Sequence, residues 1–468
     1  MSLRAKAEKR KPMTVRWMLT AVLLAALLAA CGGGGGGKGG ATPTVSGPVT
    51  VDLWHTMTAA NQDTLKSLVD RFNSSQNEVR VNLVFQGNAE DILTKLLATL
   101  GTSNVPAVAQ LLDVYTQLMV DSGEIVPVQD FIDREGYDLS DYEPRAVKYY
   151  TLEGRLQSMP FNVSTNVLFY DKNAFRDAGL DPERPPATLD EVRQYSEKLL
   201  RRDDAGNIVR SGIALDIGPW YLENMLVMHG DLYADNGNGR EGRATEVVFN
   251  QEPGKEFFRW WRDMVKEGLA INTGRNPSGI DNLLAVGAGR AAMTISSSAA
   301  LRSVISVLEG GQQPTVDLGV APLPGLEGSI AGPPVGDSSL WIMKGRPEAE
   351  QEAAWKLIKY LMEPEQQAEW FAGTGFVAVR RSSYDLPAAT QAVERYPAFM
   401  VPVEQLRRGP DTPATRGALI GPFPKVREAL AHNIEEMILQ SKDPDRALDY
   451  AAAEANQIIA DYNRRLGE

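Results

Sequence analysis

Residues 49–112 alternate between strand-like and helix-like hydrophobic patterns, and this alternation restricts the fold more than any other feature of the sequence. Apolar residues recur at every second position in some segments, and at the spacing of one helix face in another, at Leu65, Leu68, Val69 and Phe72. A strand–helix–strand–helix–strand order indicates a parallel sheet with covered faces, in the α/β class. The expected strands are Val49–Trp54, Val79–Phe85 and Ala107–Leu112, with helices over 65–72 and Glu90–Leu100.

The same kinds of segment recur along the rest of the chain. Because 468 residues exceed what one core usually holds, about 250–300 residues, two α/β lobes with interleaved segments are the economical arrangement. A helix is expected to begin at Thr188, which forms a capping-box pattern with Glu191. The other expected elements are a strand and short helix from Asn166, helices over 255–269 and 350–362, and strands over Ala291–Ile295, Leu318–Ala321 and Leu340–Met343.

The amino terminus has the organisation of an export signal. A basic stretch, Arg4–Arg16, precedes an apolar run, Trp17–Ala30, that is shorter than the roughly 20 residues a bilayer-spanning helix needs. The sequence Leu28-Ala29-Ala30-Cys31 resembles the bacterial lipoprotein box, in which the cysteine is lipidated and becomes the first residue of the mature protein. The alternatives are a plain signal peptide with an incidental cysteine and an uncleaved membrane anchor.

We interpret residues 1–30 as a lipoprotein signal peptide and the glycine-rich residues 31–47 as a flexible linker. The protein is then expected outside the cytoplasm, lipid-anchored through Cys31 to the cell membrane on its periplasmic or cell-surface side. Cys31 is the only cysteine of the chain, so an internal disulfide is excluded.

The charge and the motifs argue against several functional classes. The net charge is −12, and it becomes −17 once residues 1–30, with six basic residues and one acidic residue, are removed. Such a charge repels nucleic acids and anionic membrane surfaces. The sequence contains no nucleophile elbow, no H-E-x-x-H zinc motif and no P-loop. We therefore expect a binding protein rather than an enzyme, with no catalytic residue, no cofactor, no metal and no nucleic-acid partner.

Six segments between about Val49 and Asn463 carry a common family pattern. They are LWHTMTAANQDTLKSLVDRFNSSQ, QLMVDSGEIVPVQDFI, MPFNVSTNVLFYDKNAFRDAGLDPERPPATLDE, AAMTISSSAALRSV, GDSSLWIMKG and AAWKLIKYLMEPEQQAEWFAGTGFVAVRR. Together they resemble the family-1 extracytoplasmic solute-binding proteins of ABC importers, and most closely the glycerol-3-phosphate-binding branch. The third segment is the most specific of the six.

The resemblance implies a two-lobed periplasmic-binding-protein fold of type II. In this family several crossover segments join the lobes, the lobes close on a solute, and the closed form docks on the transmembrane subunits of a permease. The expected first lobe comprises residues 48–162 and 297–338, and the expected second lobe comprises residues 163–296 and 339–468. Crossovers are then expected near Met159–Ser164, Ile295–Ser298 and Asp337–Trp341.

Five positions keep or nearly keep a ligand-binding residue of the resembled branch. Ser164 and Ser297 match its serines, and Arg427 matches its phosphate-contacting arginine. Asp113 stands where the branch has a glutamate that bonds polyol hydroxyls. Trp220 keeps an aromatic ring that can stack on a ligand face.

Three positions depart from the branch. Ala89 and Phe376 replace tyrosines, and Asp337 replaces a glycine whose backbone approaches the phosphate. A carboxylate repels a phosphate by about 4 kcal/mol for unit charges about 4 Å apart at an effective dielectric constant of about 20. An Asp337–Arg427 pair would remove this repulsion but would occupy the arginine. The departures favour a neutral sugar, oligosaccharide or polyol as the ligand, with glycerol 3-phosphate or a glycerophosphodiester as the alternative.

Trp54, His55 and Trp341 are further candidates for lining the cleft, because each lies next to an expected strand end or crossover. Each of them can equally pack in the core. We expect a monomer whose partners are its solute, an ABC permease and, through the lipid anchor alone, a membrane. A surface lipoprotein glycosidase and a structural or adhesive lipoprotein are the alternatives from other classes.

Overall fold

The fold is described from a computed structural model, which covers residues 47–276, 279–310 and 316–467. The expected signal peptide (1–30), the expected lipidation site Cys31 and residues 31–46 of the expected linker lie outside the described residues. None of the helices within these ranges has the length and apolar character that a bilayer crossing needs.

The first of two large sheets has the strand order β2-β1-β3-β14-β4, and β7 also pairs with β14. β1 is parallel to β2 and β3, as the sequence predicts, whereas β14 is antiparallel to β3, β4 and β7. Val51 and Leu53 are buried while Asp52 between them is exposed, so the predicted alternation is confirmed. The strands are β1 (Val49–His55), β2 (Val79–Phe85), β3 (Val108–Leu112), β4 (Ile125–Val126), β7 (Met159–Ser164) and β14 (Gly336–Met343).

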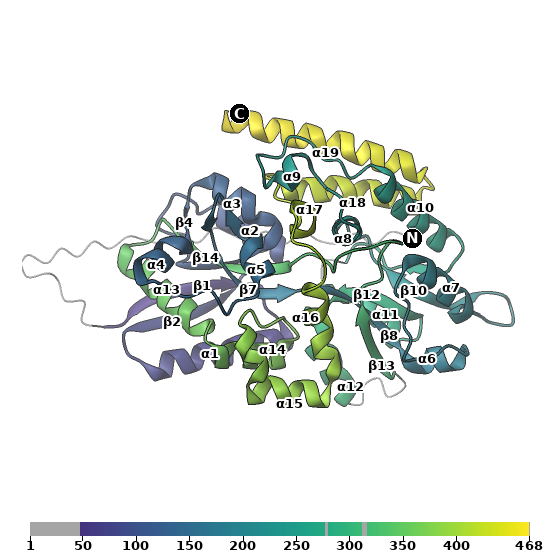
Figure 1. The fold of residues 1–468 in the computed structure, drawn as a ribbon, viewed down its shortest axis with the longest axis horizontal. Coiled ribbons are helices and arrows are strands. Elements are labelled where there is room, and N and C mark those ends of the chain that lie inside the picture. The colour runs from purple at the N-terminus through teal and green to yellow at the C-terminus, as the bar shows by residue number, and fades with distance from the viewer. Residues whose placement is uncertain (1–46, 277–278, 311–315, 468) are drawn as a thin grey trace, which may run out of the picture. The chain divides into compact units, whose positions relative to one another are not determined.

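The second large sheet has the order β11-β10-β12-β8-β13, and β9 also pairs with β10. β10 is parallel to β11 and β12, whereas β8 is antiparallel to β12 and β13. The strands are β8 (Asn166–Asp171), β9 (Arg201–Arg202), β10 (Ile208–Leu215), β11 (Ala270–Asn272), β12 (Ala291–Ser297) and β13 (Leu318–Pro322). A separate hairpin consists of β5 (Thr151–Leu152) and β6 (Arg155–Leu156). Figure 1 shows the two large sheets side by side, and each is the centre of one lobe.

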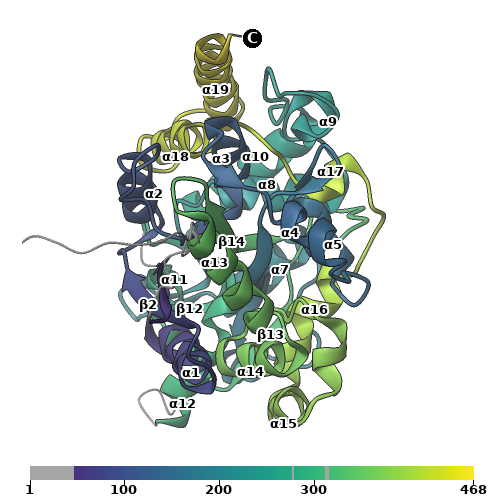
Figure 2. The same cartoon turned by 90° about the vertical axis from the view of Figure 1, so that its left-hand side faces the viewer.

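Helices of the first lobe pack against its sheet or against one another, and Figure 2 shows α13 in front of β14. In α1 the buried side chains are Leu65, Leu68, Val69 and Phe72, the predicted apolar face. These helices are α1 (Ala59–Ser75), α2 (Ala89–Leu97), η1 (Asp113–Tyr115), α3 (Thr116–Ser122), α4 (Val128–Glu135), α5 (Pro144–Tyr149), η2 (Ser298–Ala300), α12 (Leu301–Glu309), α13 (Glu348–Leu361), α14 (Pro364–Thr374), η3 (Arg381–Asp385) and α15 (Pro387–Arg395).

The remaining helices surround the second sheet, and α19 lies along α18 and α10 at the top of Figure 1. The start of α7 follows the predicted cap, since the Thr188 side chain accepts a hydrogen bond from the Glu191 amide. These helices are α6 (Lys172–Asp177), α7 (Leu189–Leu199), α8 (Trp220–His229), α9 (Asp235–Gly239), α10 (Glu252–Lys266), α11 (Asp281–Gly287), η4 (Pro397–Phe399), α16 (Met400–Leu406), α17 (Pro413–Arg416), α18 (Phe423–Leu439) and α19 (Pro444–Leu466).

The chain passes between the two sheets repeatedly. It leaves the first sheet after β7 and enters the second at β8, with Thr165 between them. Gln405 of α16 ties two of the crossing segments together, because its Nε2 donates to Thr165 Oγ1 (2.6 Å) and its Oε1 accepts from the Leu323 amide (3.0 Å). The lobes are therefore joined by a hydrogen-bonded set of segments rather than by one linker.

Two late strands do not follow the division of the lobes that is expected from the sequence at residue 338. β13 lies before that point but pairs with β8 in the second sheet, and β14 pairs with β3 in the first sheet although it extends to Met343. The crossing between these strands lies in residues 323–335, ahead of the expected Asp337–Trp341. Helices α13 and α14 also pack beside the first sheet rather than in the second lobe. Sheet membership follows from long-range pairing, which the local apolar pattern of a strand does not specify.

Candidate ligand-binding site

Three of the expected ligand residues meet where the two lobes join. Ser164 ends β7, Ser297 ends β12, and Asp337 lies near the start of β14. The Ser164 hydroxyl donates a hydrogen bond to Asp337 Oδ2 (3.0 Å). The Ser297 hydroxyl donates in turn to Ser164 Oγ (3.0 Å) and accepts from the Ala299 amide (3.1 Å). Residues that are far apart in the sequence thus form one polar chain at the junction.

Asp337 has a backbone conformation that normally favours glycine. Its φ is 80°, in the left-handed region that side chains with a Cβ rarely adopt. Burial raises the pKa of its carboxyl to about 6, against the hydrogen bonds from Ser164 and Ser297, which favour the charged form. At neutral pH this carboxylate is an acceptor for ligand hydroxyls and a source of repulsion for a ligand anion.

A second carboxyl, that of Asp113, lies at the carboxyl end of β3, where η1 begins. The residue is 8% exposed. Burial raises the pKa of Asp113 to about 7; the charge of Arg427 lowers this pKa, and the charges of Glu223 and Asp337 raise it. Arg427, Glu223 and Asp337 therefore lie near enough to Asp113 for their charges to act on its carboxyl.

Arg427 of α18 is already paired with one of these carboxylates. Its Nε and Nη2 donate to the two carboxylate oxygens of Glu223, in α8, at 2.7 and 2.6 Å. Burial disfavours the charged guanidinium, but the carboxylate of Glu223 outweighs this effect and the pKa of Arg427 is raised. Arg427 does not pair with Asp337, so the pairing that the sequence left open does not form. Asp113 is only partly ionised at neutral pH, but Glu223 and Asp337 still outnumber the single guanidinium, so the cluster (Asp113, Glu223, Asp337 and Arg427) disfavours an anionic ligand.

The comparisons with known proteins identify the family of the chain. The family of bacterial extracellular solute-binding proteins matches residues 67–401. A sn-glycerol-3-phosphate-binding periplasmic protein UgpB of Salmonella typhimurium is 31% identical over 424 residues, 89% of this chain and 93% of that protein. The chain belongs to the bacterial extracellular solute-binding proteins.

Solved structures share the fold of this solute-binding protein. One is UgpB from Mycobacterium tuberculosis in complex with glycerophosphocholine, with a TM-score of 0.73, 21% identity and coverage of 89% of this chain and 99% of that one. Another is the cyclic α-maltosyl-1,6-maltose binding protein from Arthrobacter globiformis, with a TM-score of 0.70, 24% identity and coverage of 89% and 100%. A third is the sugar-binding protein MalE from Xanthomonas citri, with a TM-score of 0.71, 22% identity and coverage of 90% and 100%. These relatives are binding proteins and not enzymes.

Three other residues expected at the site of this solute-binding protein are partly exposed. Trp220 starts α8, is half-buried and packs on Tyr221 with ring centroids 3.8 Å apart. Trp54 near the end of β1 is also half-buried. Ala89 is the first residue of α2, and its carbonyl accepts a hydrogen bond from the Tyr115 hydroxyl (3.1 Å). A tyrosine of η1 therefore lies next to the position where the resembled branch has one.

Three expected residues are buried among core side chains instead. His55 is 2% exposed, its Nδ1 accepts from the Met57 amide (3.3 Å), and burial lowers its pKa. Trp341 is fully buried in the middle of β14. Phe376 is buried and stacks in parallel on Trp370, with centroids 5.4 Å apart. Of the two readings that the sequence left open for His55 and Trp341, the structure favours packing.

Glu223 is the member of the cluster that sequence reasoning missed. It lies one helical turn after Trp220, a spacing that places both side chains on neighbouring positions of α8. The spacing from Trp220 could have indicated that Glu223 lies at the site. Nothing in the local sequence connects Glu223 with Arg427, which is 204 residues away. Within the described ranges there is no group of three or more His, Cys, Asp or Glu side chains arranged to hold a metal ion.

Proposed function

We propose that this solute-binding protein captures a neutral sugar, oligosaccharide or polyol between its lobes and delivers it to the permease of an ABC importer. The observation that carries the proposal is the charge of the cluster: Arg427 is neutralised by Glu223, while Asp113 and Asp337 stay available as acceptors. Carboxylates that accept hydrogen bonds from hydroxyl groups suit a neutral ligand. The sugar-binding proteins that share the fold support this ligand class.

Glycerol 3-phosphate or a glycerophosphodiester is the second candidate ligand. It is supported by the 31% identity to a glycerol-3-phosphate-binding protein and by Ser164, Ser297 and Arg427, which match the resembled branch. Against it stand the carboxylate of Asp337 and the engagement of Arg427 by Glu223. A bound phosphate would either displace Glu223 from Arg427 or lie next to the carboxylate of Asp337, and each of these costs binding free energy.

A thermal-shift panel of sugars, polyols and their phosphates on the full-length protein tests this ranking. A ligand at about 100 times its dissociation constant adds about 2.7 kcal/mol of stability. We expect a neutral sugar or polyol to stabilise the protein. The stabilisation should be smaller in Asp113→Asn than in the control variant Asp52→Asn, which makes the same change at an exposed position of β1. Stabilisation by glycerol 3-phosphate alone would reverse the ranking of the two ligand classes. Turnover of a chromogenic glycoside would show that the protein is a glycosidase rather than a binding protein.

We also propose that the protein is a monomer held outside the cytoplasm by a lipid on Cys31, with residues 31–47 as the linker to the lobes. The lipoprotein box before Cys31 supports the anchor. Wild-type protein expressed in bacteria is expected to partition into detergent and to incorporate labelled fatty acid, and Cys31→Ala is expected to do neither. Incorporation of label by the Cys31→Ala protein would contradict this assignment.

A further inference from the structure

A pocket of about 640 Å³ is lined by other residues than those of the charge cluster. Its walls come from both lobes: α3, α5 and the β5–β6 hairpin on one side, and α9, α17 and the residues that follow them on the other. A volume of this size lies within the range of about 300–1,000 Å³ that small-molecule sites occupy.

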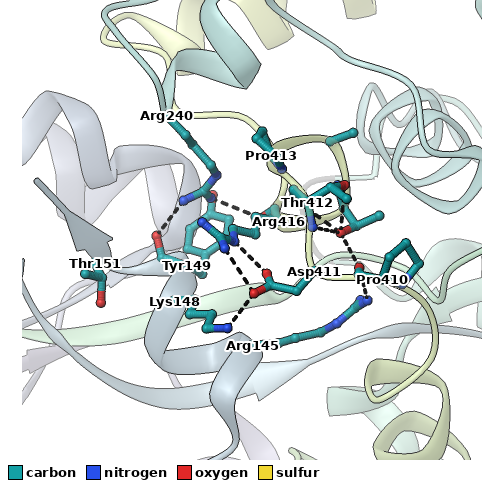
Figure 3. Close-up of polar contacts among 12 residues, drawn as sticks. Arg145, Lys148, Tyr149, Thr151, Arg240, Pro410, Asp411, Thr412, Pro413 and Arg416 are labelled. Carbon is teal, nitrogen blue, oxygen red and sulfur yellow. Dashed lines mark hydrogen bonds and ion pairs between the residues drawn. The ribbon is translucent and has the colours of Figure 1, made fainter. Parts of the chain in front are cut away.

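Basic side chains gather at this pocket around a single carboxylate, as Figure 3 shows. Arg416 Nε donates to Asp411 Oδ1 (2.6 Å), and Lys148 forms an ion pair with the same carboxylate. Behind them Arg145 of α5 donates from Nη2 to two backbone carbonyls, while its buried Nη1 has no hydrogen-bond partner among the described residues. The pKa of Asp411 is lowered, first by the hydrogen bond from Arg416 and further by Lys148.

Arg240 is the cation of the pocket whose charge is least compensated. Its guanidinium donates to the backbone carbonyls of Gly417 (2.6 Å), Tyr149 (3.2 Å) and Arg416 (3.0 Å), and it lies over the Tyr149 ring at 4.9 Å. It forms no ion pair with a carboxylate of the described residues. Burial lowers the pKa of Arg240 to about 10. Arg240 is partly buried and has no counter-ion among the described residues, so an anion in the adjoining pocket would offset the hydration that its guanidinium has lost.

The charges therefore do not balance around the pocket. Lys148 and Arg416 share the exposed carboxylate of Asp411, and Arg243 of the lining pairs with Asp121. Arg145 and Arg240 donate to backbone carbonyls instead. The acidic side chain in the pocket lining is Glu153, which is exposed to solvent. Guanidinium and ammonium groups that converge on one space are the donors that bind phosphate and carboxylate oxygens.

We propose that this pocket is a binding site for an oxyanion, either a phosphate or a carboxylate group. Lys148, Arg240 and Arg416 are the side chains that would hold it, two of them from the second lobe and one from the first. An oxyanion bound there bridges the lobes and favours their closed arrangement.

Tyr149 connects this pocket with the charge cluster. Its ring lies under the Arg240 guanidinium, and burial and the charge of Asp113 raise the pKa of its phenol. A ligand with hydroxyl groups at one end and an anionic substituent at the other would match the acidic cluster and the basic pocket together. This fuller form of the inference, with the oxyanion as part of the cargo, rests on the solute capture of the proposed function but replaces its neutral ligand by an anionic one; a free anion in the pocket leaves the neutral ligand unchanged.

Calorimetric titration of inorganic phosphate into the full-length protein, at low ionic strength, tests the site. We expect one equivalent to bind, with an affinity at least about tenfold lower in Arg240→Gln and in Lys148→Gln, since each removes a charge-assisted contact. Lys148 is 47% exposed, so its replacement leaves the fold intact even if Arg240→Gln does not fold. Lys356→Gln, at a surface lysine of similar exposure (40%) paired with Glu78, is the matched control and is expected to bind as the wild type does.

A second pair of probes, maltose and maltose 1-phosphate, separates the two sources of the anion. If maltose 1-phosphate binds at least about tenfold more tightly than inorganic phosphate, and Lys148→Gln weakens this binding, the oxyanion is a substituent of the cargo. Equal affinities for the two phosphates identify a free anion. Failure of both phosphates to bind, or binding that is equal in Lys148→Gln, Arg240→Gln and Lys356→Gln, overturns the site, while the thermal-shift panel still decides separately whether a solute is captured.

Discussion

Replacement of Asp337 by glycine is expected to leave the protein folded. At a φ of 80° an L-residue costs about 1–2 kcal/mol relative to an unstrained conformation, and glycine removes this cost. The change also removes the hydrogen bond from the Ser164 hydroxyl to the carboxylate, which contributes about 1.5–3 kcal/mol. Because the two effects oppose each other, we expect the free energy of unfolding to change by no more than about 2 kcal/mol.

The effect of Asp337→Gly on binding should be much larger. A unit negative charge about 4 Å from a phosphate at an effective dielectric constant of about 20 costs about 4 kcal/mol, so its removal raises the affinity for glycerol 3-phosphate by up to about a thousandfold. The affinity for a neutral sugar or polyol should fall by about tenfold, because one charged acceptor for its hydroxyls is lost. The substitution therefore exchanges one ligand preference for the other.

Calorimetry at pH 7.5, above the pKa of about 6 of Asp337, measures both affinities. Asp337→Asn is the matched control, because asparagine tolerates the left-handed region and has no charge. If charge decides, both variants gain affinity for glycerol 3-phosphate. A gain in the glycine variant alone would assign the effect to backbone shape, and no gain in either would refute the electrostatic reasoning.

Three further results are expected. Burial raises the pKa of Asp113 to about 7 from the ordinary 3.8, so its protonation stabilises the folded state fully below about pH 4, and this stabilisation is lost as the pH rises through 7. Between pH 5 and 8 the free energy of unfolding of the wild type should therefore fall by up to about 3 kcal/mol more than that of Asp113→Asn. The titration of His55 is common to both proteins, and parallel pH curves would contradict this reasoning. Arg427→Gln leaves the carboxylate of Glu223 buried without its partner and should cost about 3–5 kcal/mol in denaturant unfolding, whereas the double variant with Glu223→Gln should recover most of that loss. Asp121→Asn should enlarge the radius of gyration of the unliganded protein in X-ray scattering, because the Asp121 carboxylate of α3 accepts hydrogen bonds from second-lobe side chains; identical scattering curves would show that these contacts do not hold the lobes together.

Elements with strong local periodicity were predictable from the sequence. The first strands and helices appear where the alternation places them, and the buried face of α1 is the predicted one. The parallel pairing of β1 with β2 and β3 follows from the same order. Such features depend on neighbours within a few residues, which the sequence displays directly.

The junction of the site was partly predictable. The resemblance pointed to Ser164, Ser297 and Asp337, and the structure brings their side chains into one hydrogen-bonded chain. The partner of Arg427 was not predictable, since a carboxylate 204 residues away becomes its neighbour only after α8 and α18 pack. Trp341 shows the opposite difficulty, because an aromatic residue in a strand has the same local pattern whether it faces a cleft or a core.

The place of β14 in the first sheet bears on how the chain is synthesised. β14 lies between β3 and β4 and also holds β7, so these three strands have no common partner until residues 336–343 have left the ribosome. By then the whole second sheet, through β13, has already been made. A nascent chain or a truncated product that ends before Gly336 exposes an unpaired edge on β3, which invites aggregation. The first lobe to be translated is thus the last whose sheet can be completed.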